Sequence, residues 1–358
     1  MVRQNFDEVL AAFPVAGSFT ISSLGKGHIH KSYKICPVNQ SADPCCFVLQ
    51  RINTAIFRQP EYIANNWQLT AQYLFKQNPE YQFLRFIPTQ SGHYFFVHNQ
   101  YHWRLLPFLE GEVFEHSRQE EKVFQAAKAF GTFARLTAKI DLSEFNEIIP
   151  NFHDATARWK QFTTALSAAS PSRIKNAEAA INLIYQFEPI IHKANDLQHK
   201  LPKRLQHMDA KLGNVLFTPN QKQPAILLDL DTLMPATILS DTGDMIRSMA
   251  ANTSEEETNL KKVYINKEML EAVHEGWMHG LNQTLEEKEN KLFYFSGEFI
   301  ILLQAIRFIT DYFLNDQYYP VDHPEHNLNR TMNQLKLLQS LIAIQKDYPL
   351  NESCCNLS

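Results

Sequence analysis

The chain has 358 residues, which suits one large domain or two lobes that share a cleft, and we expect two lobes. Apolar residues make up 44% of the chain and charged residues 20%, so the composition supplies a core and excludes wholesale disorder. The formal net charge is −4, and the lysines and arginines are scattered, which leaves no basic stripe for nucleic acid.

The N-terminal third contains short alternating segments that predict strands. Residues 18–35 alternate and are interrupted by Gly25-Lys26-Gly27, a pattern that predicts a hairpin. Glycines at such a tip let backbone amides approach an anion, so Gly25 and Gly27 are candidate phosphate-binding residues, although most such hairpins are ordinary turns. Residues 1–10 contain acidic residues and no long apolar run, so we expect no signal peptide there.

The next elements complete a small lobe. A strand is predicted over 47–52, and Pro60 opens a helix with an apolar face. Two more alternating segments, over 81–88 and 92–97, precede the run Y-H-W-R-L-L-P-F-L-E-G at 101–111. Pro107 in this run stiffens the crossing into the rest of the chain.

From about residue 117 onward the pattern is mainly helical. The fold class that this order predicts is α+β, with a small antiparallel-sheet lobe over 1–106 and a larger helical lobe over 107–358. The helical patterns that follow the first cover residues 152–168, 173–196, 254–264, 266–281, 288–315 and 328–346.

Membrane and redox signals are weak. Residues 292–314 approach the length of a membrane span, but charged residues such as Glu298 and Asp311 interrupt them, so we expect a buried helix and no membrane partner. The five cysteines include the adjacent pairs Cys45-Cys46 and Cys354-Cys355, which seldom bridge each other. We therefore expect reduced thiols in a cytoplasmic protein.

The most informative segment spans residues 206–247. It begins Q-H-M-D-A-K-L-G-N, in which Asn214 follows Asp209 by five residues. A carboxylate at position 209 can accept a proton from an attacking hydroxyl, and an amide at this offset suits a metal contact. An H-x-D pair alone is weak, because the two residues often meet in capped turns. We expect His207 to shape the loop through backbone hydrogen bonds.

A second acid follows at the distance that phosphoryl transfer requires. After a short apolar strand over 215–217 and a polar turn, a strand over 225–228 leads into Asp229. Because this reaction builds little covalent bonding on the protein, positioning and charge neutralisation carry the catalysis. Asn214 and Asp229 are therefore the expected Mg²⁺ ligands of an ATP-dependent kinase.

These residues resemble the aminoglycoside phosphotransferase and choline kinase superfamily, whose loop reads H-x-D-x-x-x-x-N. Met208, where protein kinases usually carry Arg, fits the small-molecule branch. Within that branch, D-L-D-T-L-M-P with D-T-G-D-M-I-R is most similar to the N-acetylhexosamine 1-kinases, which phosphorylate the anomeric hydroxyl of N-acetylglucosamine or N-acetylgalactosamine. Other similar segments span nearly the whole chain: G-H-I-H-K-S-Y at 27–33, L-Q-R-I-N at 49–53, I-P-N-F-H-D-A-T-A-R at 149–158 and R-F-I-T-D-Y-F-L-N-D-Q-Y-Y at 307–319.

On the nucleotide side, the resemblance assigns two regions. Kinases place a cation from the strand at 47–52 on the α- and β-phosphates, and this strand carries Arg51 and no lysine. Because related families tolerate Arg there, Arg51 is expected to contact phosphate, with Gln50 as the alternative inward-facing residue. The run at 101–111 resembles the hinge that reads an adenine edge, which places Pro107 and Leu109 beside the nucleotide.

On the substrate side, the D-T-G-D-M-I-R motif leaves two interpretations open. Asp244 either caps a helix and holds the catalytic loop or, with Arg247, receives sugar hydroxyls. The glycine of this motif allows a tight bend. Either His28 or His30 could reach a sugar, and the resemblance favours His28, although among fourteen histidines each is expected at the surface.

Three polar side chains, Gln304, Arg307 and Asp311, share one face of the apolar segment near residue 300. Such a stripe is either an internal ion-pair network or a wall of the substrate site. The resemblance favours the wall, in which Arg307 binds hydroxyls beside the aromatic face of Tyr318 or Tyr319.

The expected partner is thus a small-molecule sugar, phosphorylated on its anomeric hydroxyl with ATP and Mg²⁺. Two alternatives remain: a kinase of another acceptor, such as choline, homoserine, a methylthiosugar or an aminoglycoside, and a pseudokinase that only binds a nucleotide or sugar. The missing strand lysine favours the pseudokinase, whereas the presence of Asp209, Asn214 and Asp229 together argues against it. The preferred hexosamine and the oligomeric state stay open.

Overall fold

The computed structural model describes residues 6–24, 30–38, 45–219 and 223–347. The chain divides into two compact units, and each is built from separated segments. The first unit comprises Met1–Glu112, Lys139–Pro150 and Leu216–Met234. The second comprises Val113–Ala138, Asn151–Val215 and Pro235–Ser358. The chain therefore passes between the units several times, whereas the sequence predicts a single boundary between residues 106 and 107.

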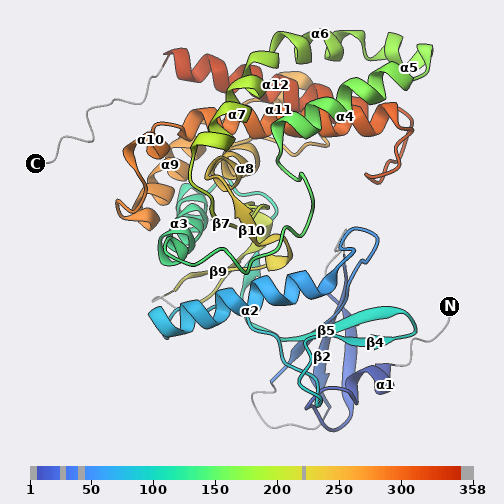
Figure 1. Cartoon of the computed structure of the whole chain (residues 1–358), viewed down its shortest axis with the longest axis vertical. Coiled ribbons are helices and arrows are strands. Elements are labelled where there is room, and N and C mark those ends of the chain that lie inside the picture. The colour runs from blue at the N-terminus through green and yellow to red at the C-terminus, as the bar shows by residue number, and fades with distance from the viewer. Residues whose placement is uncertain (1–5, 25–29, 39–44, 220–222, 348–358) are drawn as a thin grey trace, which may run out of the picture. The chain divides into compact units, whose positions relative to one another are not determined.

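The first unit is built on a five-stranded antiparallel sheet in the order β1-β2-β3-β5-β4. Figure 1 labels β2, β4 and β5 of this sheet. On one face of the sheet, Val9 and Leu10 pack against Ile35, Leu49 and Leu105. The strands are β1 (Phe19–Ser23), β2 (Lys31–Pro37), β3 (Phe47–Arg51), β4 (Phe96–His98) and β5 (Tyr101–Pro107), and the helices are α1 (Phe6–Leu10) and α2 (Pro60–Gln77).

Helix α2 begins at Pro60, as the sequence predicts, and its apolar stripe is buried. Trp67 in this stripe lies beside the Arg104 guanidinium, 5.1 Å from the ring centre, and its indole N–H donates to the Leu84 carbonyl at 2.5 Å. Arg104 pairs with Gln50 across β3 and β5 and therefore points to the face opposite Leu49. Helices α1 and α2 thus cover opposite faces of the sheet.

A side-chain amide ties the later segments into the first unit. The Asn66 amide on α2 donates to the carbonyls of Asn146 at 2.8 Å and Leu233 at 2.7 Å, and its oxygen accepts from the Asn146 backbone N–H at 2.8 Å. The segment before Leu233 contains β8 (Val215–Phe217), β9 (Ala225–Leu227) and the 3₁₀ turn η2 (Leu230–Thr232), and β6 (Glu112–Val113) joins them in the sheet order β6-β8-β9.

Cys36 and Cys46 form a disulfide, so the expectation of reduced thiols is wrong for this pair. Strands β2 and β3 pair antiparallel with Ile35 opposite Phe47. Cys36 follows Ile35 and Cys46 precedes Phe47, so this register brings the two cysteines together. Their Cα atoms lie 4.5 Å apart, within the range that a disulfide requires. Sequence spacing does not show this proximity, because it depends on the strand register.

The second unit is mainly helical, and the described part of the chain confirms the predicted α+β class. Its two-stranded sheet pairs β10 (Met234–Ala236) with β7 (Arg204–Gln206). The helices are α3 (Glu120–Thr137), α4 (Ala155–Ala168), α5 (Pro171–Asn176), α6 (Glu178–Gln186), α7 (Glu188–Lys200), α8 (Leu239–Met249), α9 (Lys267–Leu281), α10 (Glu287–Asn290), α11 (Phe293–Phe313) and α12 (His326–Asp347), with 3₁₀ turns η1 (Leu212–Asn214) and η3 (Leu260–Lys262).

Glycines set how closely the central helices of this unit approach. A Cβ on Gly280 of α9 would collide with the Lys128 carbonyl of α3, and one on Gly243 of α8 would collide with α11 at Ile300. Gly243 lies inside α8. Its role is therefore close helix packing, and the tight bend expected at the D-T-G-D motif is wrong.

Helix α11 is the one helix of the described residues that is long and apolar enough to cross a membrane. It lies beside α12 (Figure 1), and 72% of its most apolar window is buried within the fold. Burial against neighbouring helices accounts for its apolar composition, as expected for a core helix. The helix expected over 254–264 is wrong, because only the 3₁₀ turn η3 forms in this segment.

Candidate active site

The loop after β7 carries the predicted catalytic residue. The Asn214 side-chain amide donates to the Asp209 carboxylate and to the Asp209 backbone carbonyl, each at 2.8 Å. The Lys211 ammonium also pairs with the Asp209 carboxylate at 2.8 Å. Burial alone would raise the pKa of Asp209, but Lys211, His207 and Asn214 lower it to about 2. Asp209 is therefore an ionised carboxylate at neutral pH, held in place by both neighbours.

A buried acid on α8 holds the backbone of this loop. The Asp241 carboxylate accepts the backbone N–H of His207 and that of Met208, each at 2.7 Å. Met208 has φ of 69°, so this contact stabilises a left-handed turn at a non-glycine residue. Burial raises the pKa of Asp241 to about 6. His207 itself is buried and its ring forms a T-shaped pair with Phe130; its backbone N–H makes the contact with Asp241, and a loop-shaping role for its side chain stays a prediction.

Asp244 does not hold the loop, so this part of the sequence interpretation is wrong. It lies inside α8 rather than at a cap, and its carboxylate accepts from Arg247 at 2.8 Å. Arg247 also contacts Glu255 at 3.3 Å. Asp241, three residues earlier, has the loop-holding role because the helix turns it toward β7. Binding of a sugar by Asp244 and Arg247 stays a prediction.

The predicted metal acid lies in the first unit. Asp229 follows β9, is exposed and precedes η2, and its φ is 52°. Asp209 and Asn214 belong to the second unit. The predicted meeting of these three side chains therefore stays a prediction.

Asp231, two residues after Asp229, is buried within an ion-pair network. Arg104 donates to both oxygens of its carboxylate, with Nη2 to Oδ2 at 2.7 Å, and His30 Nε2 lies 2.6 Å from Oδ2. Burial alone would raise the pKa of Asp231, but Arg104 and His30 hold it well below its usual range. The expectation that His30 is a surface residue is wrong. His28, Gly25 and Gly27 lie outside the described residues.

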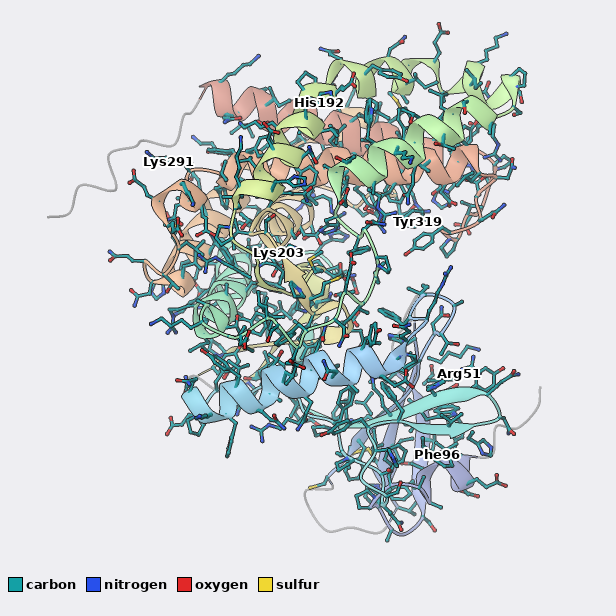
Figure 2. All side chains as sticks on the ribbon, in the orientation of Figure 1. Arg51, Phe96, His192, Lys203, Lys291 and Tyr319 are labelled. Atoms are coloured by element: carbon teal, nitrogen blue, oxygen red, sulfur yellow. A yellow bond between two sulfur atoms is a disulfide. The ribbon has the colours of Figure 1, made fainter. Side chains whose placement is uncertain are left out.

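On strand β3, Gln50 and not Arg51 faces this ion-pair network. Gln50 accepts from Arg104 Nε at 2.9 Å, so Gln50 points toward Asp231. Arg51, the neighbouring residue, points to the other face, where its guanidinium stacks on Tyr101 at 4.2 Å; Figure 2 shows Arg51 on this sheet. The phosphate role of Arg51 stays a prediction, and Arg104 is a cation that sequence reasoning missed.

The expected hinge begins within β5. Pro107 pairs with Phe47 at the end of that strand, and the next backbone N–H, of Phe108, donates to the Cys46 carbonyl at 2.9 Å. Leu109 follows and is partly exposed. Nucleotide binding by Pro107 and Leu109 stays a prediction.

The polar stripe on α11 splits into two separate structures. Arg307 stacks on Phe152, 4.7 Å from the ring centre, and donates to Gln304 at 3.0 Å. Asp311 instead accepts the backbone N–H groups of Gln317, Tyr318 and Tyr319 at 2.8 to 2.9 Å. The ion-pair interpretation is therefore wrong for Arg307 and Asp311.

The Asp311 contacts fix the loop after α11 in the second unit. Tyr319 lies on this loop (Figure 2), and its ring contacts Phe308 at 4.7 Å and Tyr318 at 4.8 Å. Arg307 lies 5.7 Å from the Tyr319 ring, whereas Tyr318 is 53% exposed. The structure thus brings Arg307 and Tyr319 together, as the resemblance implies, and leaves Tyr318 largely open to solvent.

Two further residues belong to this neighbourhood, and sequence reasoning missed both. Arg158 donates from Nε to the Phe152 carbonyl at 3.1 Å, and His153 is buried. Burial, and then Arg307, Arg158 and Arg247, hold the pKa of His153 well below its usual range, so its imidazole is neutral. Among the described residues, His153 Nδ1 has no hydrogen-bond partner. The I-P-N-F-H-D-A-T-A-R segment carried the only sequence signal for both.

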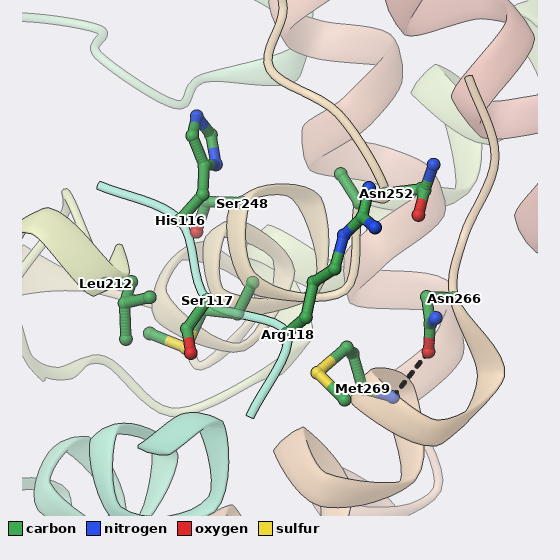
Figure 3. Close-up of a pocket in the computed structure, with 10 residues that line it drawn as sticks. His116, Ser117, Arg118, Leu212, Ser248, Asn252, Asn266 and Met269 are labelled. Carbon is green, nitrogen blue, oxygen red and sulfur yellow. Dashed lines mark hydrogen bonds between the residues drawn. The ribbon is translucent and has the colours of Figure 1, made fainter. Parts of the chain in front are cut away.

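A separate pocket of the second unit opens beside the catalytic loop. It has a volume of about 110 Å³ and is lined by residues 116–118, by Leu212, by the end of α8 with Asn252, and by the start of α9. Figure 3 shows Arg118 and Asn252 among the side chains that line it. None of the predicted site residues lines this pocket.

A loop in which an asparagine holds a carboxylate, within an α+β fold, is the arrangement expected of a phosphotransferase of the protein kinase-like fold. The sequence model of a family described as the phosphotransferase enzyme family matches residues 81–273. The chain belongs to that family.

Solved structures share this fold at low sequence identity. An aminoglycoside phosphotransferase from Alicyclobacillus acidocaldarius has 14% identity and a TM-score of 0.64, with 95% of each chain covered. A choline kinase from Cryptosporidium parvum has 13% identity and a TM-score of 0.59, with 98% of each chain covered. A microcompartment-associated aminopropanol kinase has 12% identity and a TM-score of 0.57, covering 94% of this chain and 96% of its own.

Proposed function

We propose that the protein transfers the γ-phosphoryl group of ATP to the anomeric hydroxyl of an N-acetylhexosamine. Membership of the phosphotransferase family supports the reaction class. The hydrogen-bonded pair Asp209 and Asn214 supplies a carboxylate and an amide for that reaction. A related fold, a spectinomycin phosphotransferase, was crystallised with ADP, which supports a nucleotide donor. The observation that carries the choice of acceptor is the charge around Phe152.

Asp209 is assigned to the acceptor hydroxyl. Its ionised carboxylate would orient that hydroxyl and take its proton as phosphoryl transfer proceeds. An anomeric hydroxyl is more acidic than most alcohols, so a weak base held in place suffices. The Lys211 ammonium and the Asn214 amide keep the carboxylate from turning away.

Mg²⁺ is assigned to Asn214 and Asp229. Amide and carboxylate oxygens are the ligand type that Mg²⁺ prefers, and the Asn214 amide nitrogen is already used by Asp209, which leaves its oxygen for a cation. Asp229 is exposed. When bound, Mg²⁺ would neutralise charge on the phosphates.

The surroundings of Phe152 disfavour a cationic acceptor. Arg158 and Arg307 both contact this residue, and the oxygens to which they donate in the described part of the chain are neutral: Phe152 O, Gln161 Oε1 and Gln304 Oε1. Arg247 differs, because Asp244 and Glu255 pair with it. Burial, and then Arg307, lower the pKa of Arg158 to about 10, which still leaves it charged at neutral pH.

Two half-buried arginines repel an ammonium group and attract electronegative oxygens, and the neutral His153 adds no negative charge to offset them. Choline, ethanolamine and aminoglycosides carry such cations, whereas an N-acetylhexosamine carries hydroxyls and an amide carbonyl. Arg307 lies beside the Tyr319 ring, so the site combines a hydrogen-bond donor for sugar hydroxyls with an aromatic face. The arrangement therefore supports a neutral sugar.

Acceptor profiling tests the proposal. The purified protein is incubated with γ-³²P-ATP, Mg²⁺ and each of N-acetylglucosamine, N-acetylgalactosamine, glucosamine, choline, homoserine and kanamycin. We expect label on the N-acetylated sugars, in a product that is acid-labile and no longer reduced by borohydride. Label on choline or kanamycin with none on a sugar would contradict the acceptor assignment, and no transfer to any acceptor would favour a pseudokinase.

A further inference from the structure

The first unit contains a buried ion pair to which none of the nucleotide, metal or sugar assignments gives a role. Arg104 on β5 is 1% exposed and donates to both carboxylate oxygens of Asp231, which is itself fully buried. His30 provides a third contact, with Nε2 at 2.6 Å from Oδ2. The other ring nitrogen, Nδ1, accepts the Asn53 backbone N–H at 3.1 Å, so Nε2 carries the proton and faces the Asp231 carboxylate at contact distance.

The sheet fixes the Arg104 side chain before it reaches Asp231. Its Nε donates to the Gln50 side-chain oxygen at 2.9 Å, and the Gln50 amide donates to Ser32 Oγ at 2.8 Å. The Trp67 ring of α2 lies beside the guanidinium at 5.1 Å. Contacts from three neighbouring strands and a helix therefore fix the position of the guanidinium. This fixed position lets Arg104 bind both oxygens of the Asp231 carboxylate.

Asp231 in turn constrains the residue that the metal assignment uses. Asp229 is exposed and has left-handed backbone angles, φ 52° and ψ 55°, while Leu230 and Asp231 after it are buried in η2. This conformation is uncommon for a non-glycine residue, although Asp adopts it more readily than most, and neighbouring contacts help to hold it. The Arg104–Asp231 contact lies two residues from this position and fixes the turn that follows it.

We infer that Arg104, Asp231 and His30 form a positioning network that holds the Asp229 turn in the conformation that binds the cation–nucleotide complex. This inference rests on the proposed assignment of Asp229 as a metal ligand. Arg104 acts through the turn and does not itself contact phosphate.

Direct ligation of a metal by the same cluster is a different reading, and the contacts argue against it. One ligand atom each of His30, Asp229 and Asp231 lies within 4.8 Å of the others. However, both Asp231 oxygens accept from Arg104, and His30 Nε2 lies 2.6 Å from one of them. A cation at those atoms would sit against a guanidinium, so only the exposed Asp229 suits it.

The test measures cation binding without any sugar. Mn²⁺ binding to the full-length protein with saturating ADP is followed by electron paramagnetic resonance of the free ion. The variants are Arg104→Gln, Asp231→Asn, His30→Ala and His30→Gln, the last of which retains a donor near Nε2. Arg104→Lys keeps the charge and removes the bidentate contact, and it serves if Arg104→Gln does not fold.

The chain offers a matched control in the second unit. Arg204 makes a comparable bidentate contact with buried Glu289, at 2.8 and 2.7 Å. Arg204→Gln removes a similar ion pair and lowers thermal stability by a similar mechanism. It leaves the Asp229 turn untouched, so its Mn²⁺ affinity reports the effect of destabilisation alone.

We expect Arg104→Gln, Asp231→Asn and His30→Ala to weaken Mn²⁺ binding about tenfold or more, the range seen when outer-shell partners of metal ligands are lost. His30→Gln is expected to retain most of the affinity, and Arg204→Gln all of it. Unchanged Mn²⁺ affinity in folded Arg104 and Asp231 variants would overturn the inference, as would an equal loss in Arg204→Gln. Because no acceptor is present, failure of sugar phosphorylation does not affect this result.

Discussion

Asp209 is the residue on which the proposed chemistry depends most directly. Asp209→Asn keeps the size of the side chain and removes the charge that orients the acceptor hydroxyl. We expect turnover to fall about 10²-fold or more, because loss of a general base typically costs that much. ADP affinity, measured by calorimetry, is expected to stay nearly unchanged. Turnover close to that of the unchanged protein would remove Asp209 from the mechanism.

His153 makes stability depend on pH. Its pKa is lowered in the folded protein, first by burial and then by the three arginines, so the unfolded chain binds more protons below pH 6.5. Its contribution to stability is therefore complete above pH 6.5 and declines as pH falls toward the folded pKa, by at most about 1.4 kcal/mol per pH unit.

Urea denaturation at pH 5, 6 and 7 measures this effect. The free energy of unfolding is expected to fall more steeply toward pH 5 in the unchanged protein than in His153→Gln, which cannot titrate. His192→Gln is the control, because this histidine is largely exposed, at 71% of its side chain. Parallel pH profiles for the unchanged protein and His153→Gln would show that His153 is not buried as a neutral group.

At the scale of single residues, the sequence predicts contacts between residues that lie close together in the chain. Asp209 and Asn214 are five residues apart, and their contact follows from one turn of the chain. Arg104 and Asp231 are separated by 127 residues, so no local pattern indicates their contact. His30 has the same difficulty, because its burial depends on a strand register and a distant acid.

Among the elements, helices with a clear apolar stripe are predicted best. The 3.6-residue period places α9 within a residue of its true start, since its stripe packs directly on α3. The predicted segment 173–196 is in fact three helices, which break at Ala177 and Phe187. The side-chain period continues across these breaks, so periodicity alone does not show them.

The β2–β3 disulfide gives a prediction at the scale of elements. With Cys36 and Cys46 bonded, three of the five cysteines are left to react with Ellman's reagent in the denatured, unreduced protein. Cys36→Ser is expected to raise that number to four by releasing Cys46, and Cys45→Ser to lower it to two. Five reactive thiols in protein purified without reductant would show that the strands pair without the bond.

For the whole molecule, composition predicts a strand-rich and a helix-rich part but not how the chain is shared between them. Segments 139–150 and 216–234 belong to the first unit, and Asn66 of α2 binds backbone in both of them. Such contacts join residues 80 and 167 positions apart. As a result, Asp229 belongs to one unit and Asn214 to the other, so no local sequence pattern shows whether the two side chains bind the same ion.

A double-mutant cycle tests whether these two groups serve one ion. Thermal unfolding with ADP is measured with Mg²⁺ and with EDTA for Asn214→Ala, Asp229→Ala and the double variant. The Mg²⁺-dependent part of the stabilisation is taken as the difference between the two conditions, which cancels the loss of the Asn214–Asp209 hydrogen bonds. A ligand at one hundred times its Kd stabilises a protein by about 2.7 kcal/mol. An Mg²⁺-dependent stabilisation of this size is large enough to compare between the single and double variants.

If both side chains bind the same Mg²⁺, the double variant is expected to lose little more than the worse single variant, because removal of either ligand already releases the ion. If they act at separate places, the two losses add to within about 0.3–0.5 kcal/mol, as independent sites do. Asp209→Asn is the control, since it removes a charge near Asn214 without removing an assigned ligand. Additive losses would mean that Asn214 and Asp229 do not share a cation, and the proposed phosphoryl-transfer site would then lack its metal.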